Sequence, residues 1–354
     1  MDKNSFYNQR EINCIKRIDR ILKDVPYYVE DFIIGVENKT SALTRLNYVY
    51  DLRVFFDFLS KKVFRNKKIT DIDFNDLKLL EASDFEYFLN YLNHYNVNGK
   101  NERCTETGKA RKLSTLRAFY KYFFNKNMLP ANTPTKVSMP KIHDKEIIRL
   151  DSNEKVNEIS EMLYTVESGD GLTKKQKYFH DATKIRDLAI VTLFLGTGIR
   201  ISELVGLNTD DIDFNTNSFV VTRKGGNRSV LYFNEQVADA LKSYYFWRSD
   251  NKKIPASEKA FFVSLQNRRI STRCVQELVK KYAKLASPLK HITPHKLRST
   301  FGTNLYRQTG DIYLVADCLG HKDVNTTRKH YAAIDDDLRK KAAKNLSITN
   351  TDNK

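Results

Sequence analysis

Apolar residues recur at steps of three and four through the first 130 positions, which is typical of helices with one buried face. The steps occur in four stretches: 12–25, 46–59, 85–92 and 113–123. Glycine is sparse here, because only Gly35, Gly99 and Gly108 of the 13 glycines fall in this part of the chain. The pattern predicts a small helical bundle over residues 1–129.

A cluster of prolines follows this bundle. Three of the seven prolines in the chain are Pro130, Pro134 and Pro140. Proline cannot continue a helix and stiffens an extended path. We therefore expect a linker over residues 130–148 and a second domain over 149–354; the alternative is a long loop within one domain.

The second half mixes helical and strand patterns. Helices are predicted at 153–165, 184–195, 271–285, 295–309 and 311–319. Strands predicted at 219–222 and 229–233 are joined across Gly225 and Gly226, which favours a hairpin, and 261–265 is a candidate third strand. The predicted fold class is mainly α with a small β-sheet.

The charge of the chain indicates a partner. Lys and Arg number 60 against 43 Asp and Glu, a formal net charge of +17, and residues 1–140 hold 24 basic and 17 acidic side chains, so the excess is spread over both halves. A pI near 9.5 favours a polyanion, with nucleic acid ahead of a membrane surface. The alternative is a protein that is merely basic.

Composition excludes several classes. A hydrophobic content of 41% is too high for a disordered chain, and the apolar run at 188–195 is too short to span a bilayer. The N-terminus lacks the apolar core of a signal peptide. The four cysteines are scattered without a C-x-x-C pair, which fits neither a zinc site nor a disulfide framework. We expect a protein of the reducing cytoplasm with no membrane partner and no metal.

Residues 193–207, LFLGTGIRISELVGL, contain the first candidate site. We expect an apolar helix to end at Gly196 and a Gly-Thr-Gly turn to place Arg200 at the start of the next helix. Arginine there can bind a phosphate with two parallel hydrogen bonds, and Glu203 is placed to orient the guanidinium. The alternative is an ordinary helix corner with a surface Arg–Glu pair.

The segment TPHKLRST contains the second candidate site. Thr293 is predicted to cap a helix that begins at Pro294. His295 and Arg298 then share one face of the first turn, where free N–H groups and the helix dipole attract anions. The segment therefore predicts a phosphate site; the alternative is a surface pair.

Three further residues carry little information alone. Lys224 precedes the turn glycines and is a candidate proton donor. Arg223 is the alternative at this turn, but lysine can give up a proton and arginine effectively cannot. His321 follows Gly320, which is predicted to end a helix in the left-handed conformation. Tyr331 is one of 19 tyrosines, on a short helix after Asn325 and Thr326.

Taken together, the order Arg, Lys, His-x-x-Arg, His, Tyr resembles the active site of the tyrosine recombinases, the phage integrase family. The motifs that carry the resemblance are GTGIRISEL, RKGG, TPHKLRST, LGHKD and NTTRKHY. The layout is most similar to Xer-type recombinases. The resemblance implies a helical, SAM-like core-binding domain and an integrase-type catalytic domain that form a clamp around DNA.

The resemblance also implies an activity. Family members cut one DNA strand with a tyrosine, form a 3′-phosphotyrosine and pass through a Holliday junction, without a cofactor or a metal. It implies site-specific recombination in chromosome-dimer resolution or in integration and excision of mobile elements. The alternatives are a type IB topoisomerase and a catalytically idle DNA-binding regulator.

The resemblance assigns a role to each site residue. Tyr331 is the expected nucleophile, and Arg200 and Arg298 are expected to bind the non-bridging oxygens. The proton transfers and the last phosphate contact fall to the remaining three: His295 takes the tyrosine proton, Lys224 protonates the 5′-oxygen, and His321 hydrogen-bonds the phosphate.

The implied partners are double-stranded DNA with a specific site, further copies of the chain and an accessory directionality protein, in a nucleoid-associated setting. The copies form a dimer on each site and a tetramer on synapsed DNA. Residues 336–345 are predicted to form a helix that exchanges between subunits; the alternative is docking on its own subunit. Expected DNA contacts, the first three on the face opposite an apolar stripe, are Arg111, Lys112, Arg117, Arg269, Arg273 and Lys280.

Overall fold

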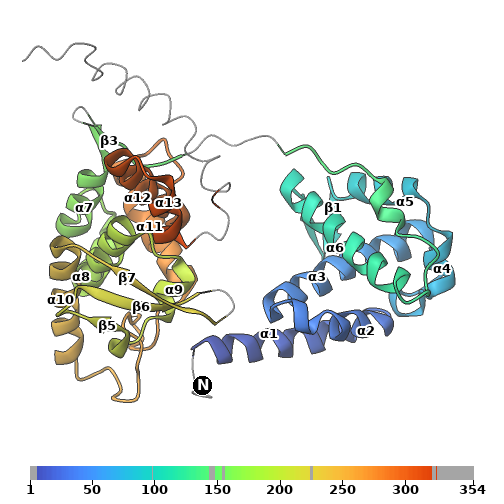
Figure 1. Cartoon of the computed structure of the whole chain (residues 1–354), viewed down its shortest axis with the longest axis horizontal. Coiled ribbons are helices and arrows are strands. Elements are labelled where there is room, and N and C mark those ends of the chain that lie inside the picture. Colours follow the sequence, from blue (N-terminus) through green and yellow to red (C-terminus); the bar gives the residue numbers. More distant parts are fainter. Residues whose placement is uncertain are drawn as a thin grey trace, which may run out of the picture. The chain divides into compact units, whose positions relative to one another are not determined.

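The computed structural model describes residues 6–97, 99–142, 148–153, 156–223, 226–320 and 324. The chain divides into two compact units, Met1–Lys145 and Glu146–Lys354. We call them the N-terminal unit and the C-terminal unit and describe each by itself (Figure 1).

The N-terminal unit is helical where it is described, with one short hairpin. Its elements are α1 (Phe6–Leu22), α2 (Tyr28–Gly35), α3 (Ala42–Phe58), α4 (Phe74–Leu79), α5 (Ala82–Tyr91), β1 (Tyr95–Val97), β2 (Lys100–Glu102) and α6 (Glu106–Phe124). The four stretches of helical spacing correspond to α1, α3, α5 and α6, so these predictions are confirmed. The spacing did not predict α2, α4 or the hairpin.

Aromatic side chains from several helices form the core of this unit. Tyr28, Phe56 and Phe119 come from α2, α3 and α6 and are fully buried or nearly so. Phe55 stacks on Phe85 of α5 with ring centroids 5.6 Å apart. The apolar stripes therefore meet in one core, which is why the helical spacing is so regular.

The proline-rich segment belongs in part to the N-terminal unit. Residues Thr133–Lys136 form a short 3₁₀ helix, and Pro134 is buried. The Arg117 guanidinium donates to the carbonyl oxygens of Pro134 and Val137, at 3.2 and 2.6 Å. Because Val137 also packs into the aromatic core, the chain leaves this unit after that residue and not at 130, where the linker was expected.

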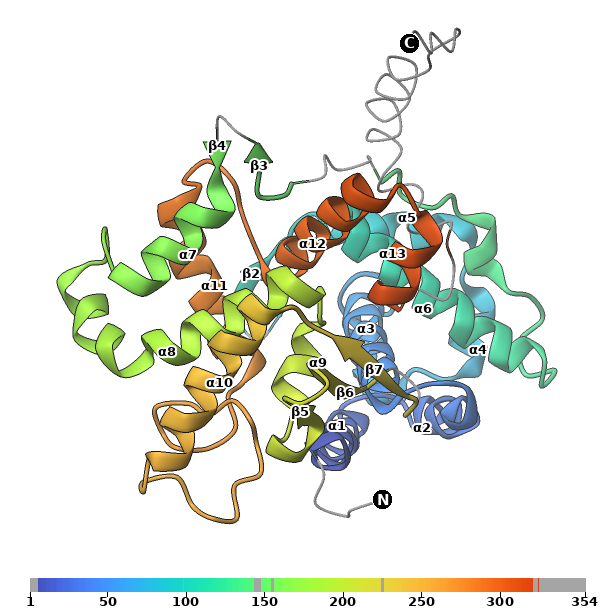
Figure 2. The ribbon, with the colours of Figure 1, turned by 60° about the vertical axis from the view of Figure 1, so that its left-hand side comes forward.

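The C-terminal unit surrounds a long helix, α8. Its helices are α7 (Glu158–Ser168), α8 (Lys174–Thr197), α9 (Ile201–Gly206), α10 (Glu235–Asp250), α11 (Thr272–Ala286), α12 (Pro294–Thr309) and α13 (Ile312–Leu319). Helix α8 packs against α7, α10 and α12, and α12 lies beside α13 (Figure 2). Much of α8 is buried, which explains its nearly continuous apolar run.

The strands of the C-terminal unit form small antiparallel sheets. The larger sheet contains β5 (Ile212–Asp213), β6 (Ser218–Thr222) and β7 (Arg228–Tyr232), in that order, and Val220 pairs with Val230. This confirms the predicted hairpin. A second pair, β3 (Ser152–Asn153) and β4 (Val156–Asn157), precedes α7.

Three element predictions in this unit were wrong. The third strand is β5 and not 261–265, where Val263 only bridges to Arg269. Helix α8 begins at Lys174, ten residues early, because Thr173 and Gln176 cap each other. Helix α7 begins at Glu158 instead of 153.

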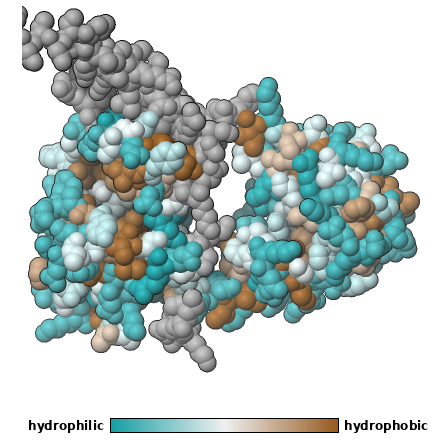
Figure 3. All heavy atoms as spheres, in the orientation of Figure 1, coloured by the Kyte–Doolittle hydropathy of each residue, from teal (hydrophilic) through white to brown (hydrophobic). Residues whose placement is uncertain are grey.

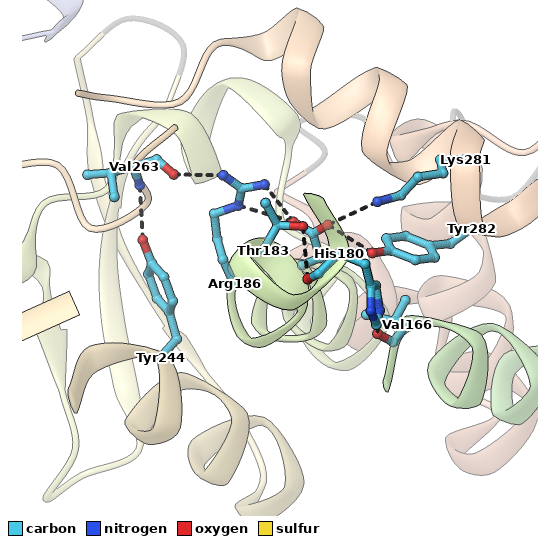
Figure 4. Close-up of polar contacts among 9 residues, drawn as sticks. Val166, His180, Thr183, Arg186, Tyr244, Val263, Lys281 and Tyr282 are labelled. Carbon is cyan, nitrogen blue, oxygen red and sulfur yellow. Dashed lines mark hydrogen bonds and ion pairs between the residues drawn. The ribbon is translucent and has the colours of Figure 1, made fainter. Parts of the chain in front are cut away.

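A buried polar network fastens α8 to its neighbours (Figure 4). Asp187 of α8 is 1% exposed, and its carboxylate accepts from Arg186 at 2.7 Å, from the Tyr282 hydroxyl at 2.9 Å and from Lys281 at 3.3 Å. The other side of Arg186 donates to the Val263 carbonyl at 3.0 Å. One carboxylate thus joins α8 to α11 and, through Arg186, to the 261–263 segment.

The face drawn in Figure 3 is mainly hydrophilic, with hydrophobic side chains in small separate patches. Among the helices that the structure describes, not one combines the length and the apolar character needed to cross a bilayer.

Candidate active site

Arg200 follows a left-handed turn at the end of α8. The helix continues one residue past the expected end, and Gly198 closes it with φ 60° and ψ 24°. A side chain at Gly198 would overlap Phe301, so glycine is required for both conformation and space. The chain then leads directly into α9, with Arg200 at its N-cap.

Glu203 holds Arg200 as the sequence predicted. One carboxylate oxygen accepts from the Arg200 backbone N–H at 3.0 Å, and the other accepts from its guanidinium at 2.8 Å. Glu203 is buried, whereas a third of the Arg200 side chain is exposed. The pair is therefore not an ordinary surface pair, because its acid is inside the protein and its guanidinium faces outward.

Arg298 extends from the first turns of α12 to the turn that precedes Arg200. Pro294 is the first residue of α12, as predicted, but the Thr293 side chain makes no capping bond. Arg298 is 5% exposed, and its guanidinium donates to the carbonyl oxygens of Gly198 and Leu319. It therefore connects the turn before Arg200 to the end of α13.

The end of α13 is where the two arginines meet. Gly320 closes this helix in the left-handed conformation, with φ 59° and ψ 48°, as predicted. Arg200 donates to the Gly320 carbonyl at 2.9 Å, and Arg298 donates to the carbonyl of Leu319. Two guanidiniums from positions 98 residues apart are thus held at consecutive carbonyls, directly before His321 in the chain.

His295 is exposed in the first turn of α12, three residues before Arg298. The two side chains are in different surroundings, because Arg298 turns inward. Lys224, His321 and Tyr331 lie outside the described residues, as does the predicted helix at 336–345.

Arg223, which the sequence offered as the alternative to Lys224, lies beside the two arginines. It directly follows β6, and its guanidinium packs against Gly320 so closely that a methyl group at that position would overlap it. Burial raises the pKa of the neighbouring Cys318 thiol, Asp317 adds to this, and the Arg223 charge acts in the opposite direction. The structure therefore places Arg223 beside the turn that receives Arg200 and Arg298.

The basic residues of α6 are not all on an open face. Lys112 is 7% exposed and donates to the buried Asp51 carboxylate at 3.0 Å, which contradicts its predicted position opposite the apolar stripe. Arg111 also binds Asp51, but about half of its side chain is exposed. Arg117 holds the 134–137 segment. Of the three, Arg111 has the exposed side chain.

The three candidate DNA contacts of the C-terminal unit also differ in exposure. Arg269 donates to the carbonyls of Val205 and Leu207 and to the Asn208 side chain, at 2.8, 3.0 and 2.6 Å, and thus fastens the end of α9. Arg273 is 79% exposed and pairs with Glu277 one turn along α11. Lys280 is exposed on the same helix.

All four cysteines lie within the described residues and are free thiols. In the part of the chain that the structure describes, no three His, Cys, Asp or Glu side chains gather in a group suited to a metal ion.

Comparison with known proteins identifies the family to which a chain with this fold belongs. The model of the phage integrase family matches residues 157–337, and that of the phage integrase N-terminal SAM-like domain matches 29–127. The chain therefore belongs to the phage integrase family.

Relatives of the chain are tyrosine recombinases. Tyrosine recombinase XerC of Caldanaerobacter subterraneus subsp. tengcongensis is 35% identical over 333 residues, covering 90% of this chain and 87% of that protein. Tyrosine recombinase XerS of Lactococcus lactis subsp. cremoris (strain MG1363) is 30% identical over 337 residues, covering 89% and 93%. The protein is a tyrosine recombinase of the Xer type, an enzyme that cleaves and rejoins DNA.

Solved structures share the fold. The XerH site-specific recombinase bound to a palindromic difH substrate, a post-cleavage complex, matches with a TM-score of 0.66 at 18% identity, over 93% of this chain and 88% of that one. A lambda integrase dimer bound to a COC′ core site matches with a TM-score of 0.59 at 16% identity, over 88% and 79%. At these identities the likeness concerns the fold alone.

Proposed function

We propose that Arg200 and Arg298 bind the phosphate at which this recombinase cuts DNA. The observation that carries the proposal is their convergence on the turn at Leu319 and Gly320. An arginine presents five N–H donors, and the contacts described for Arg200 use two of its side-chain nitrogens. The guanidinium is partly exposed, so it can bind a non-bridging phosphate oxygen while Glu203 and Gly320 keep its position.

The remaining roles follow the motif order. The Tyr331 hydroxyl attacks the phosphorus atom and gives its proton to His295, while the P–O5′ bond breaks. Lys224 gives a proton to the departing 5′-oxygen, and His321 donates a hydrogen bond to a phosphate oxygen. The products are a 3′-phosphotyrosine and a 5′-hydroxyl. The 5′-hydroxyl of a partner duplex then reverses these steps and rejoins the strand.

The two units divide DNA binding between them. The N-terminal unit acts as the core-binding domain and the C-terminal unit as the catalytic domain, and together they enclose the duplex. Among the six candidates, Arg111, Arg273 and Lys280 are the exposed side chains and are therefore best placed to contact phosphates. Lys112 is buried, and Arg117 and Arg269 are partly buried and donate to backbone carbonyls.

The enzyme acts in the cytoplasm on chromosomal DNA, either to resolve chromosome dimers or to integrate and excise a mobile element. It assembles as a dimer on each site and as a tetramer on two synapsed sites, with residues 336–345 of each copy docking on a neighbour. An accessory protein sets the direction of exchange.

Covalent capture of DNA tests this proposal. A pool of nicked suicide duplexes with a randomised central region is incubated with the protein, and SDS-resistant adducts are recovered and sequenced. The wild type should form adducts on a defined sequence with or without EDTA, whereas Tyr331→Phe should form none, because the nucleophilic oxygen is gone.

Tyr313→Phe provides the matched control, since Tyr313 is an exposed tyrosine of α13 with no proposed role. It should form adducts at the wild-type rate. An adduct formed by Tyr331→Phe, or a wild type that forms none, would refute the assignment of the nucleophile.

A further inference from the structure

The Arg223 side chain has buried nitrogen atoms that donate to none of the described residues. Its Nε and Nη1 atoms are buried, and neither has a hydrogen-bond partner among the described residues. The backbone around it is fixed, because Arg223 N–H donates to Asn227 O at 2.7 Å and Gly226 N–H donates to Arg223 O at 3.1 Å. The point at which the Arg223 side chain leaves the backbone is therefore fixed at the end of β6.

Such an arrangement is unfavourable in the absence of a ligand. A buried N–H group without an acceptor loses its hydration and gains nothing in return, and the loss is larger when the group is charged. Arginine cannot relieve this by losing its proton. No described residue supplies an acceptor for the two buried nitrogen atoms. The acceptor that best suits a guanidinium is an anion with two oxygens, such as a phosphate.

The position of Arg223 indicates which anion. Its guanidinium lies against Gly320, whose carbonyl accepts from Arg200, and the preceding carbonyl of Leu319 accepts from Arg298. Strand β6, which ends just before Arg223, also packs on α9, which begins just after Arg200. Three guanidiniums therefore surround one helix end, and their mutual repulsion is relieved when an anion binds between them.

We propose that Arg223 is a third arginine of the phosphate site and binds a non-bridging oxygen of the phosphodiester held by Arg200 and Arg298. This rests on the proposed function of those two residues. The role of Arg223 is to stabilise the negative charge that develops in the transition state, and it transfers no proton. It is thereby separate from Lys224, the next residue, which donates the proton to the 5′-oxygen.

Arg223→Met tests this, because methionine keeps much of the apolar stem and removes the charge. Without DNA, the variant should melt at the wild-type temperature or above it, since it no longer buries two guanidinium nitrogens that have no acceptor among the described residues. Inorganic phosphate should raise the melting temperature of the wild type more than that of the variant. The rate of adduct formation on saturating suicide duplex should fall by about 100-fold, and Arg223→Lys should recover part of it.

Arg228→Met is the matched control on the same hairpin. Arg228 is exposed on β7, and its guanidinium lies 3.6 Å from the Asp211 carboxylate, so its loss removes an equal charge outside the phosphate site. It should keep the wild-type cleavage rate and the wild-type response to phosphate.

The outcomes separate the two proposals. If Arg223→Met cleaves at the wild-type rate, or loses thermal stability and cleavage together without rescue by lysine, Arg223 is not a phosphate ligand. If the wild type forms no adduct that depends on Tyr331, the proposed function fails. The phosphate-dependent melting shift then still decides whether Arg223 binds an anion, since it requires no cleavage.

Discussion

Replacing Asp187 by asparagine is expected to destabilise the C-terminal unit strongly. The carboxylate is buried and accepts from the Arg186, Lys281 and Tyr282 side chains. Burial and the Asp187 charge raise the pKa of Tyr282, so the phenol remains a donor at every pH at which the protein would be handled. Asparagine removes the negative charge and turns an N–H₂ group toward these donors.

The size of the effect follows from the burial of the cluster. Removing one partner of a buried ion pair costs about 3–5 kcal/mol, because the other charge stays inside without compensation. Arg186 would be left in that state, since its side chain is 8% exposed. Tyr282→Phe removes one hydrogen bond and should cost about 1 kcal/mol. Exposed Glu277, paired with Arg273, provides the control: Glu277→Gln should cost at most about 1 kcal/mol.

Urea unfolding followed by tryptophan fluorescence measures these differences. Trp247 is the single tryptophan of the chain and lies in α10, where its ring stacks on Tyr244 at 5.7 Å. Tyr244 accepts from the Val263 backbone, to which Arg186 also donates, so the probe adjoins the network. With a slope of about 2–3 kcal/mol per molar urea, Asp187→Asn should lower the midpoint by roughly 1–2 M. A shift no larger than that of Glu277→Gln would refute the reasoning.

Two further predictions concern acid stability and the Gly320 turn. Burial by itself raises the pKa of Glu158, but hydrogen bonds from Lys290, Ser287 and the Asp151 backbone outweigh it and lower that pKa below 4.5. The carboxylate therefore adds stability above pH 4.5, and this stability is lost as the pH falls through the pKa of Glu158 in the folded state. Below pH 4.5 the melting temperature should fall less steeply for Glu158→Gln than for the wild type. Parallel plots of melting temperature against pH would contradict this. Gly320→Ala and Gly310→Ala should lose about the same thermal stability, because both glycines have positive φ and the nearest atoms to an alanine at 320 are those at the flexible end of Arg223. Of the two variants, only Gly320→Ala should slow adduct formation. In an Arg223→Met background the Gly320→Ala change should slow it little further, and an undiminished loss there would show that the overlap with Arg223 is not the cause.

The sequence by itself determined the features that depend on residues close together in the chain. Helices α1, α3, α5 and α6 of the N-terminal unit follow from apolar spacing, and the β6–β7 hairpin follows from its glycine turn. The contact of Arg200 with Glu203 needs only a three-residue step along one helix. The early start of α8 has a local cause as well, since the Thr173 and Gln176 capping pair is visible in the sequence.

Tertiary structure alone decided which basic residues are accessible. Lys112 and Arg269 look like surface cations in the sequence. Asp51 holds Lys112 inside the protein, and carbonyls at the end of α9 hold Arg269 in a partly buried position, in each case from more than 60 residues away. Arg223 likewise meets Gly320 only because the β6–β7 hairpin and the end of α13 come together in the folded unit. Periodicity shows which face of an element is apolar, but the partner of a charged side chain depends on packing between distant segments.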